Sequence, residues 1–161
     1  MRILGVDPGL NATGFGVVDI ANGQVKIVDA GSIEPKPKDL FELRLHKVYS
    51  LLGKIIVLHQ PQVLVIEKLY AHYKHPTTAS ILGHVRGVIC LLAAEHKIQL
   101  VEWPVKRIRK ALIGNGNATK EQTQQFVQRL LKIEKASLTL DTSDALALAL
   151  GHAHMLKFKI T

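Results

Sequence analysis

Four acidic residues are spaced so that folding could bring their carboxylates together. Asp7 and Glu67 each end a run of apolar residues. A continuous apolar run predicts a strand buried on both faces, and such a strand delivers its last residue to an edge of the sheet. Asp141 and Asp144 are three residues apart near the start of a predicted helix, a spacing that puts both on one helical face. If the two strands are neighbours, Asp7 and Glu67 lie side by side.

The chemistry that such a cluster supports is the binding of a hard divalent cation. Like charges raise each other's pKa unless a cation neutralises them, and carboxylates with few histidines suit Mg²⁺ or Mn²⁺. Singly, Asp7 could be a turn residue, Asp141 an N-cap and Asp144 a first-turn acid stabilised by the helix dipole. Glu67 is harder to explain in this way, because a buried glutamate is rare unless paired. Together the four indicate a metal site.

The elements that must position these acids follow from the hydrophobic pattern. Strands are predicted over residues 2–7, 14–20, 24–33, 63–67 and 98–102, with Asn22-Gly23 as a hairpin turn. Helices are predicted over residues 40–58, 77–96, 105–112, 119–132 and 141–155, and Thr119 with Gln122 fits a capping box. This order predicts an α/β fold with a mixed five-stranded sheet flanked by helices, in a single domain over residues 1–161.

The most apolar stretch, residues 81–94, is predicted to be a buried helix. It is shorter than the roughly 20 residues that a membrane span needs, and it contains His84 and Arg86. Gly83 and Gly87 lie four apart on one face, which would let the helix approach a sheet closely. We expect His84 to face the core or the sheet, and Cys90 to be a small buried hydrophobe.

Composition narrows the class of protein. Hydrophobic residues make up 47% of 161 residues, which excludes a disordered chain, and the single cysteine excludes an internal disulfide framework and a cysteine-based zinc site. The N-terminus does not resemble a signal peptide, so we expect a cytoplasmic protein without a membrane span. The net charge of +8 points to a polyanionic partner, either nucleic acid or an acidic membrane surface, although a soluble protein can simply be basic.

Four motifs, taken in order, resemble the RuvC family of Holliday-junction resolvases over nearly the whole chain. They are Gly5-Val6-Asp7-Pro8-Gly9 followed by Gly14 and Gly16, Val65-Ile66-Glu67 followed by Tyr70, residues 114–122, and residues 141–150. The resemblance implies a ribonuclease-H-like fold, a homodimer and two Mg²⁺ or Mn²⁺ ions per site. It also implies an endodeoxyribonuclease of recombination and repair that nicks two opposing strands of a four-way DNA junction symmetrically, and a branch-migration motor that docks on it.

The resemblance also assigns roles to single residues of the acidic site. The four metal carboxylates of the family correspond to Asp7, Glu67, Asp141 and Asp144. As a hypothesis, Asp7 bridges two ions about 4 Å apart, Glu67 holds one ion, and the two helical acids hold the other. Lys120 matches a family lysine near the scissile phosphates, where it would neutralise growing charge.

The same resemblance indicates residues that contact DNA. Tyr70 occupies the position of a family aromatic, usually Phe, that stacks on an unpaired base at the junction centre. Arg109 stands where the family has a second lysine, and arginine keeps the charge but changes the geometry. Its neighbours are predicted to contact the DNA backbone, with a solvated helix face as the alternative: Lys106, Arg107 and Lys110.

Other functions remain open on the sequence alone. Nucleases with the same fold include RNA-processing enzymes of the YqgF type, ribonucleases H and transposase-like integrases. A sugar-kinase or Hsp70-type ATPase opens with a similar strand but needs two lobes, and a non-catalytic nucleic-acid binder would be hindered by four acids. Asp141 with Asp144, Tyr70 and the basic segment 106–120 favour the resolvase. The apolar helix over 81–94 is a candidate dimer face.

Overall fold

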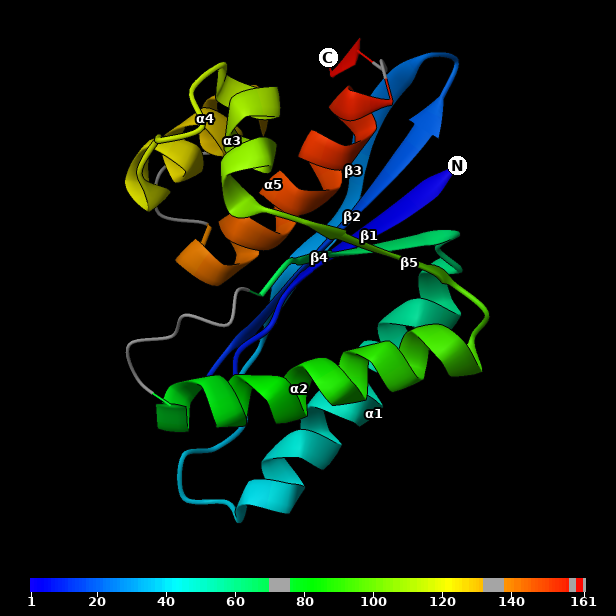
Figure 1. Ribbon diagram of the computed structural model, residues 1–161. Helices are drawn as coiled ribbons and strands as arrows, with labels where there is room; N and C mark the ends of the chain where they lie inside the picture. Colours follow the sequence, from blue (N-terminus) through cyan, green and yellow to red (C-terminus); the bar gives the residue numbers. More distant parts are fainter. Residues whose placement is uncertain (70–75, 132–137, 157–158, 161) are drawn as a thin grey trace.

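The structure, a computed structural model, describes residues 1–69, 76–131, 138–156 and 159–160 (Figure 1). Its centre is one mixed sheet with the strand order β5-β4-β1-β2-β3-β6. The strands are β1 (Arg2–Asp7), β2 (Thr13–Ala21), β3 (Gln24–Ile33), β4 (Val63–Glu67), β5 (Gln99–Trp103) and β6 (Lys159–Ile160). The first three strands pair antiparallel, whereas β4 and β5 run parallel to β1.

Helices cover both faces of this sheet. The helices are α1 (Phe41–His59), α2 (Pro76–Glu95), α3 (Val105–Ile113), α4 (Lys120–Leu131) and α5 (Leu140–Met155). Helices α1 and α2 lie on one face, and α5 with α3 and α4 lies on the other (Figure 1). Alternate residues of β1 serve the two layers, because Ile3 joins the core under α5 whereas Leu4 and Val6 join the core under α1 and α2. This two-sided burial explains the continuous apolar run.

The predicted α/β fold is confirmed, and the predicted elements agree with the observed ones within a residue or two at most ends. The hairpin turn at Asn22 and Gly23 has positive φ at both residues, 53° and 76°, as a two-residue turn of this kind requires. The sheet has one strand more than predicted. Strand β6 pairs with β3 through only two residues, which is too short for a hydrophobic pattern to reveal.

The predictions for α2 were partly wrong. Gly83 and Gly87 do not face the sheet: both are exposed, and a Cβ at either position would meet open space. His84 is exposed as well, with its ring edge-on against Phe41, and Cys90 is only half-buried. The reason is that the helix packs inward through a different stripe of residues, spaced four and three apart: Val85, Ile89 and Leu92.

The length of α2 contradicts the expectation that this apolar segment is too short to span a membrane. The helix has 20 residues, so it is not too short to span a bilayer, and residues Thr77–Glu95 are long and apolar enough to do so by composition alone. Core helices of soluble proteins meet the same criterion. In this fold, α2 contacts α1 and β5 and contributes its inward stripe to the core.

Candidate active site

Three glycines allow α5 to lie directly against the sheet. A Cβ at Gly5 or Gly14 would overlap a backbone carbonyl of α5, and a Cβ at Gly16 would overlap the side chain of Leu146. Gly14 is also the residue of β2 that pairs with Asp7 at the end of β1. These three glycines of the first motif therefore serve close packing between helix and sheet. They bring the first turn of α5 beside the end of β1.

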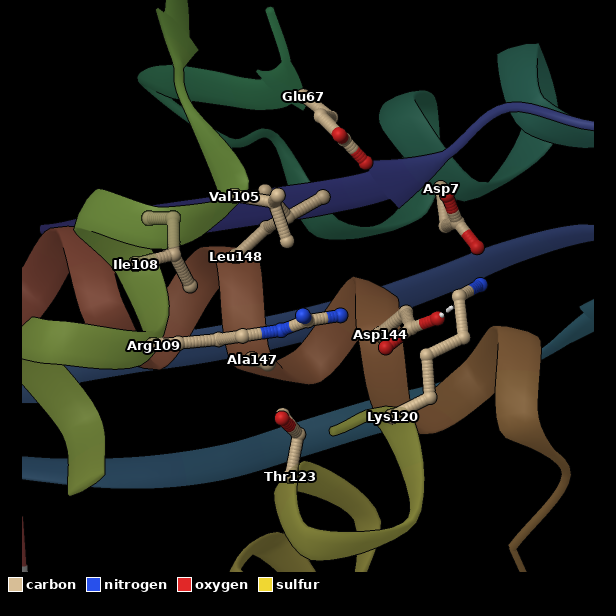
Figure 2. A pocket seen from close by; sticks show the side chains of 10 residues that line it. All are labelled: Asp7, Glu67, Val105, Ile108, Arg109, Lys120, Thr123, Asp144, Ala147 and Leu148. Carbon is tan, nitrogen blue, oxygen red and sulfur yellow. Dashed lines mark ion pairs between the residues drawn. The ribbon is translucent and has the colours of Figure 1, made fainter. Parts of the chain in front are cut away.

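The prediction that β1 and β4 are neighbouring strands is confirmed. The two strands pair in parallel up to Val6 and Ile66, so Asp7 and Glu67 leave the sheet at the same edge. A pocket of about 100 Å³ lies at this edge, and Asp144 enters it from α5 (Figure 2). The rest of the lining comes from α3, α4 and α5: Val105, Ile108, Arg109, Lys120, Thr123, Ala147 and Leu148.

The pocket makes it costly for Asp7 and Glu67 to carry negative charge. The pKa of Asp7 rises to about 7, chiefly because the carboxyl is buried and then because Asp144, Asp141 and Glu67 are negative. Burial likewise raises the pKa of Glu67, to which Asp144 contributes. The positive charge of Lys120 opposes both shifts. A bound cation would relieve the same cost.

Lys120 supplies a positive charge to this site from the chain itself. Its Nζ lies 2.8 Å from Oδ2 of Asp144 (Figure 2). Burial lowers the pKa of Lys120, but the hydrogen bond to Asp144 and the nearby negative charges outweigh this and raise it. The predicted capping box fixes the start of α4 at this lysine, because Thr119 N–H donates to Gln122 Oε1 at 2.9 Å and Gln122 N–H donates to Thr119 Oγ1 at 3.2 Å.

Asp141 lies near this pocket but is not among the residues that line it. It sits in the first turn of α5, and its charge contributes to the raised pKa of Asp7. The alternative that Asp141 caps this helix is wrong. Thr139 is the N-cap, and its hydroxyl accepts a hydrogen bond from Thr142 N–H at 3.2 Å. Asp141 is therefore not needed to start the helix.

The donor set fits a hard divalent ion. Asp7, Glu67 and Asp144 offer only oxygen atoms, which Mg²⁺ and Mn²⁺ prefer. Within the described parts of the chain, no three histidine, cysteine or acidic side chains lie close enough together to hold a metal ion as they stand. Lys120 instead neutralises Asp144. The fit thus rests on oxygen chemistry and on the raised pKa of Asp7 and Glu67.

Four of the predicted DNA-contacting residues belong to α3. Arg109 extends into the pocket from α3 (Figure 2), and its buried Nε has no hydrogen-bond partner among the residues described. Two further residues of α3, Lys106 and Lys110, are exposed. Arg107 is exposed too, with its guanidinium 4.3 Å from the ring centre of Trp103.

Trp103 is half-buried and packs against the core on the α5 side of the sheet. Its Nε1–H donates to Nδ1 of His152 at 3.0 Å, and burial lowers the pKa of that histidine. His152 is buried whereas His154 is exposed, so the two do not form a ligand pair. Tyr70, the residue predicted to stack on a base, lies outside the described residues.

Sequence reasoning missed one residue that touches the site. Arg86 is buried in α2, and its NH1 donates to the backbone carbonyl of Glu67 at 2.5 Å. Its NH2 donates to the carboxylate of Glu102. The available signal was a charged residue inside the most apolar helix, because a buried arginine requires partners.

The fold and this cluster of acids at the end of its central strand define the ribonuclease-H-like class of proteins. The family model for the crossover junction endodeoxyribonuclease RuvC matches residues 3–152. The chain belongs to the RuvC family of nucleases, which confirms the resemblance found in its motifs.

Individual relatives agree with this membership. The crossover junction endodeoxyribonuclease RuvC of Alkaliphilus metalliredigens is 38% identical over 154 residues, covering 96% of this chain and 93% of the relative. That of Chloroherpeton thalassium is 39% identical over 153 residues, covering 94% and 82%. Among solved structures, T. thermophilus RuvC in complex with a Holliday junction substrate has a TM-score of 0.85 at 21% identity, covering 98% of this chain and 96% of that one. At this identity the likeness concerns the fold.

Proposed function

We propose that this protein resolves four-way DNA junctions, by nicking two opposing strands symmetrically with the help of divalent metal ions, in recombination and repair. The observation that carries the proposal is the convergence of Asp7, Glu67 and Asp144 with Lys120 in one pocket of a RuvC-family chain. The net charge of +8 suits a DNA substrate.

The proposed catalytic roles follow from the positions of the side chains. Asp7, Glu67 and Asp144 would hold metal from three different elements, and Asp141 would complete the set from the first turn of α5. When bound, Mg²⁺ or Mn²⁺ supplies an activated water and neutralises charge on the phosphate, and a pair of ions serves both sides of the scissile bond. Lys120 contributes a positive charge beside the same phosphate.

The proposed DNA-binding roles belong to α3 and to the segment after β4. Arg109 would contact the backbone from inside the pocket, and the neighbouring Lys106, Arg107 and Lys110 would contact it from the exposed side of α3. Tyr70 is proposed, on the resemblance alone, to stack on an unpaired base.

The direct experiment uses a labelled immobile four-way junction, with and without Mg²⁺, beside a linear duplex and an RNA–DNA hybrid. We expect paired, symmetric, Mg²⁺-dependent nicks in the junction only. The D7N variant should bind the junction and fail to cut it. Cleavage of the hybrid instead would keep the fold and the site but move the function to RNA processing, and undiminished cleavage by D7N would refute the assignment of the site.

We further propose a homodimer formed through α1 and α2. A shallow, mostly apolar groove runs between these helices, lined by Leu45, Ser80, Gly83, His84, Gly87, Val88 and Leu91. Leu91 is 53% exposed, and the two outward-facing glycines leave room for close approach of a second copy. A two-fold dimer would place two like sites on a two-fold junction, as paired cuts require.

The dimer is tested by the oligomeric state of L91E in size-exclusion chromatography with light scattering. We expect the wild type to be a dimer and L91E to be a monomer at micromolar concentration. The matched control is L58E, because Leu58 is 73% exposed on α1 and is not part of the groove. This interface would be contradicted if both variants dissociated to the same extent, or if neither variant dissociated.

The remaining proposals rest on the resemblance and on composition. We propose that the chain is one functional domain over residues 1–161, that it works in the cytoplasm, and that a branch-migration motor docks on it. Co-purification of the enzyme with motor subunits on a junction tests the last proposal.

A further inference from the structure

A buried guanidinium connects α2 to the end of β4, where the proposed metal ligand Glu67 stands. Arg86 NH1 donates to the Glu67 backbone carbonyl at 2.5 Å, and NH2 pairs with the Glu102 carboxylate of β5. The Arg86 side chain is 11% exposed, whereas that of Glu102 is 40% exposed. Arg86 therefore joins a helix and the ends of two adjacent strands.

The position of these contacts matters because the sheet ends there. The pairing of β4 with β1 stops at Ile66, and Glu67 is the last residue of β4. On the other side, Lys68 N–H still donates to the Trp103 carbonyl at 2.8 Å. Glu67 therefore lies one residue beyond the pairing of β4 with β1. At this position the planar guanidinium of Arg86 supplies a well-oriented hydrogen bond to the Glu67 main chain.

We propose that Arg86 is a positioning residue for metal binding: by holding the main chain of Glu67, it keeps that carboxylate beside Asp7. The proposal rests on the proposed function only in taking Glu67 as a metal ligand. A side chain that orients a ligand in this way affects metal affinity even though it does not touch the ion. The positive charge of Arg86 acts in the same sense, because it opposes the burial that raises the pKa of Glu67.

The chain contains a matched control for this arrangement. Arg2 makes the same two kinds of contact at the opposite end of β1: NH1 donates to the His59 carbonyl at 2.7 Å, and NH2 donates to Asp19 Oδ2 at 3.2 Å. Replacing Arg2 by Gln removes a guanidinium that joins a helix end to a strand, far along the sheet from Asp7. A loss of stability common to both variants is thereby separated from an effect on the metal site.

The experiment titrates Mn²⁺ into DNA-free protein by calorimetry and compares wild type, R86Q, R86K and R2Q. We expect R86Q to weaken Mn²⁺ binding about tenfold or more. R86K should fall in between, because lysine keeps the charge but loses the fork. R2Q should bind Mn²⁺ as the wild type does, even if its melting temperature falls. In junction cleavage, R86Q should need about tenfold more Mg²⁺ for half-maximal rate, with junction binding in Ca²⁺ changed by less than about twofold.

Equal Mn²⁺ affinity of wild type and R86Q would overturn the proposal, as would an equal loss in R2Q. If the Arg86 variants do not fold, E102A decides: it frees Arg86 from its anchor on β5, and we expect a smaller loss of Mn²⁺ affinity, whereas no loss would refute the role. Because the titration contains no DNA, its result stays readable if the wild type proves not to cut junctions. That outcome would count against the proposed function and leave the metal comparison intact.

Discussion

At the scale of single residues, the fold makes the charged form of Asp7 unfavourable unless a cation is bound beside it. Its pKa rises from 3.8 to about 7 because the carboxyl is buried among other acids. Between these two pH values, Asp7 therefore keeps its proton in the folded protein but has lost it in the unfolded chain. Stability consequently falls as pH rises through this window, and it stays lower above it.

This linkage predicts that D7N is more stable than the wild type in metal-free buffer at pH 8. The shift of Asp7 corresponds to about 1–4 kcal/mol in the free energy of unfolding, once some relaxation of the site is allowed. The gain should shrink as pH falls from about 7 to below 3.8, where the wild-type carboxyl is protonated in both states. Urea unfolding of both proteins at several pH values measures it, and a gain that does not vary with pH would contradict the role of Asp7.

Added Mg²⁺ should reverse this penalty in the wild type. Because protons and metal compete for Asp7, 10 mM Mg²⁺ should raise the melting temperature more at pH 8 than at pH 5. Each kcal/mol of binding free energy corresponds to a rise of about 2–4 °C. Thermal melts with Mg²⁺ and with chelator make the comparison. D7N serves as the control and should show little dependence on metal at either pH.

Lys120 is predicted to set the pH range of cleavage. Its charge lowers the pKa of Asp7, so K120Q should raise that pKa further. The acid limb of the pH–rate profile should then move to higher pH, and the maximal rate should fall about 10²-fold because a charge beside the phosphate is lost. A slower enzyme with an unmoved profile would mean that Lys120 acts on the phosphate alone.

At the scale of elements, the site depends on how closely α5 lies on the sheet. A Cβ at Gly14 would overlap the Asp141 backbone carbonyl, so a side chain there must push the first turn of α5 away. No such crowding exists at Gly53 in α1, where a Cβ would sit 3.5 Å from Leu92. These two glycines therefore separate the effect of helix docking from the general effect of replacing a glycine.

G14A should lose about 1–3 kcal/mol of stability and most of its affinity for Mn²⁺. G53A should keep full metal affinity and gain up to about 1 kcal/mol, because alanine is the better helix former. Urea unfolding and Mn²⁺ titration of both variants check this. Unchanged Mn²⁺ binding in G14A would show that α5 need not touch β2 at this point.

At the scale of the whole molecule, the proposed symmetric resolution requires two sites that work together. The sheet carries one acidic pocket at one edge, and the proposed dimer groove lies on the α1 and α2 layer. The described part of one chain therefore offers one pocket for cutting, and we propose that symmetric resolution is a property of the dimer. Each subunit should cut its own strand.

Mixed dimers test that division of labour. When wild type and D7N are mixed in equal amounts and allowed to exchange, random pairing gives about one quarter wild-type dimers and about one half mixed dimers. We expect fully resolved junctions to fall to about one quarter of the wild-type amount, with singly nicked junctions appearing from the mixed dimers. Gel analysis of a plasmid-borne cruciform distinguishes nicked from linear product. Linear product at one half or more would mean that one subunit cuts both strands.

The amino-acid sequence by itself determined the elements and the candidate chemistry of this protein. Local periodicity located nearly every strand and helix, because apolar spacing is a local property of the chain. The ends of β1 and β4 marked Asp7 and Glu67, and the capping box marked the start of α4 at Lys120. The four motifs together identified the family.

Only the tertiary structure decided which groups meet. The pairing of Lys120 with Asp144 and the contacts of Arg86 with β4 and β5 join residues from separate elements, and no local pattern specifies such a pairing. The outward face of α2 was misjudged because both of its sides are rich in small and apolar residues, so periodicity could not say which side the sheet covers. That choice is made by the shape of the opposing layer, which exists only once the chain has folded.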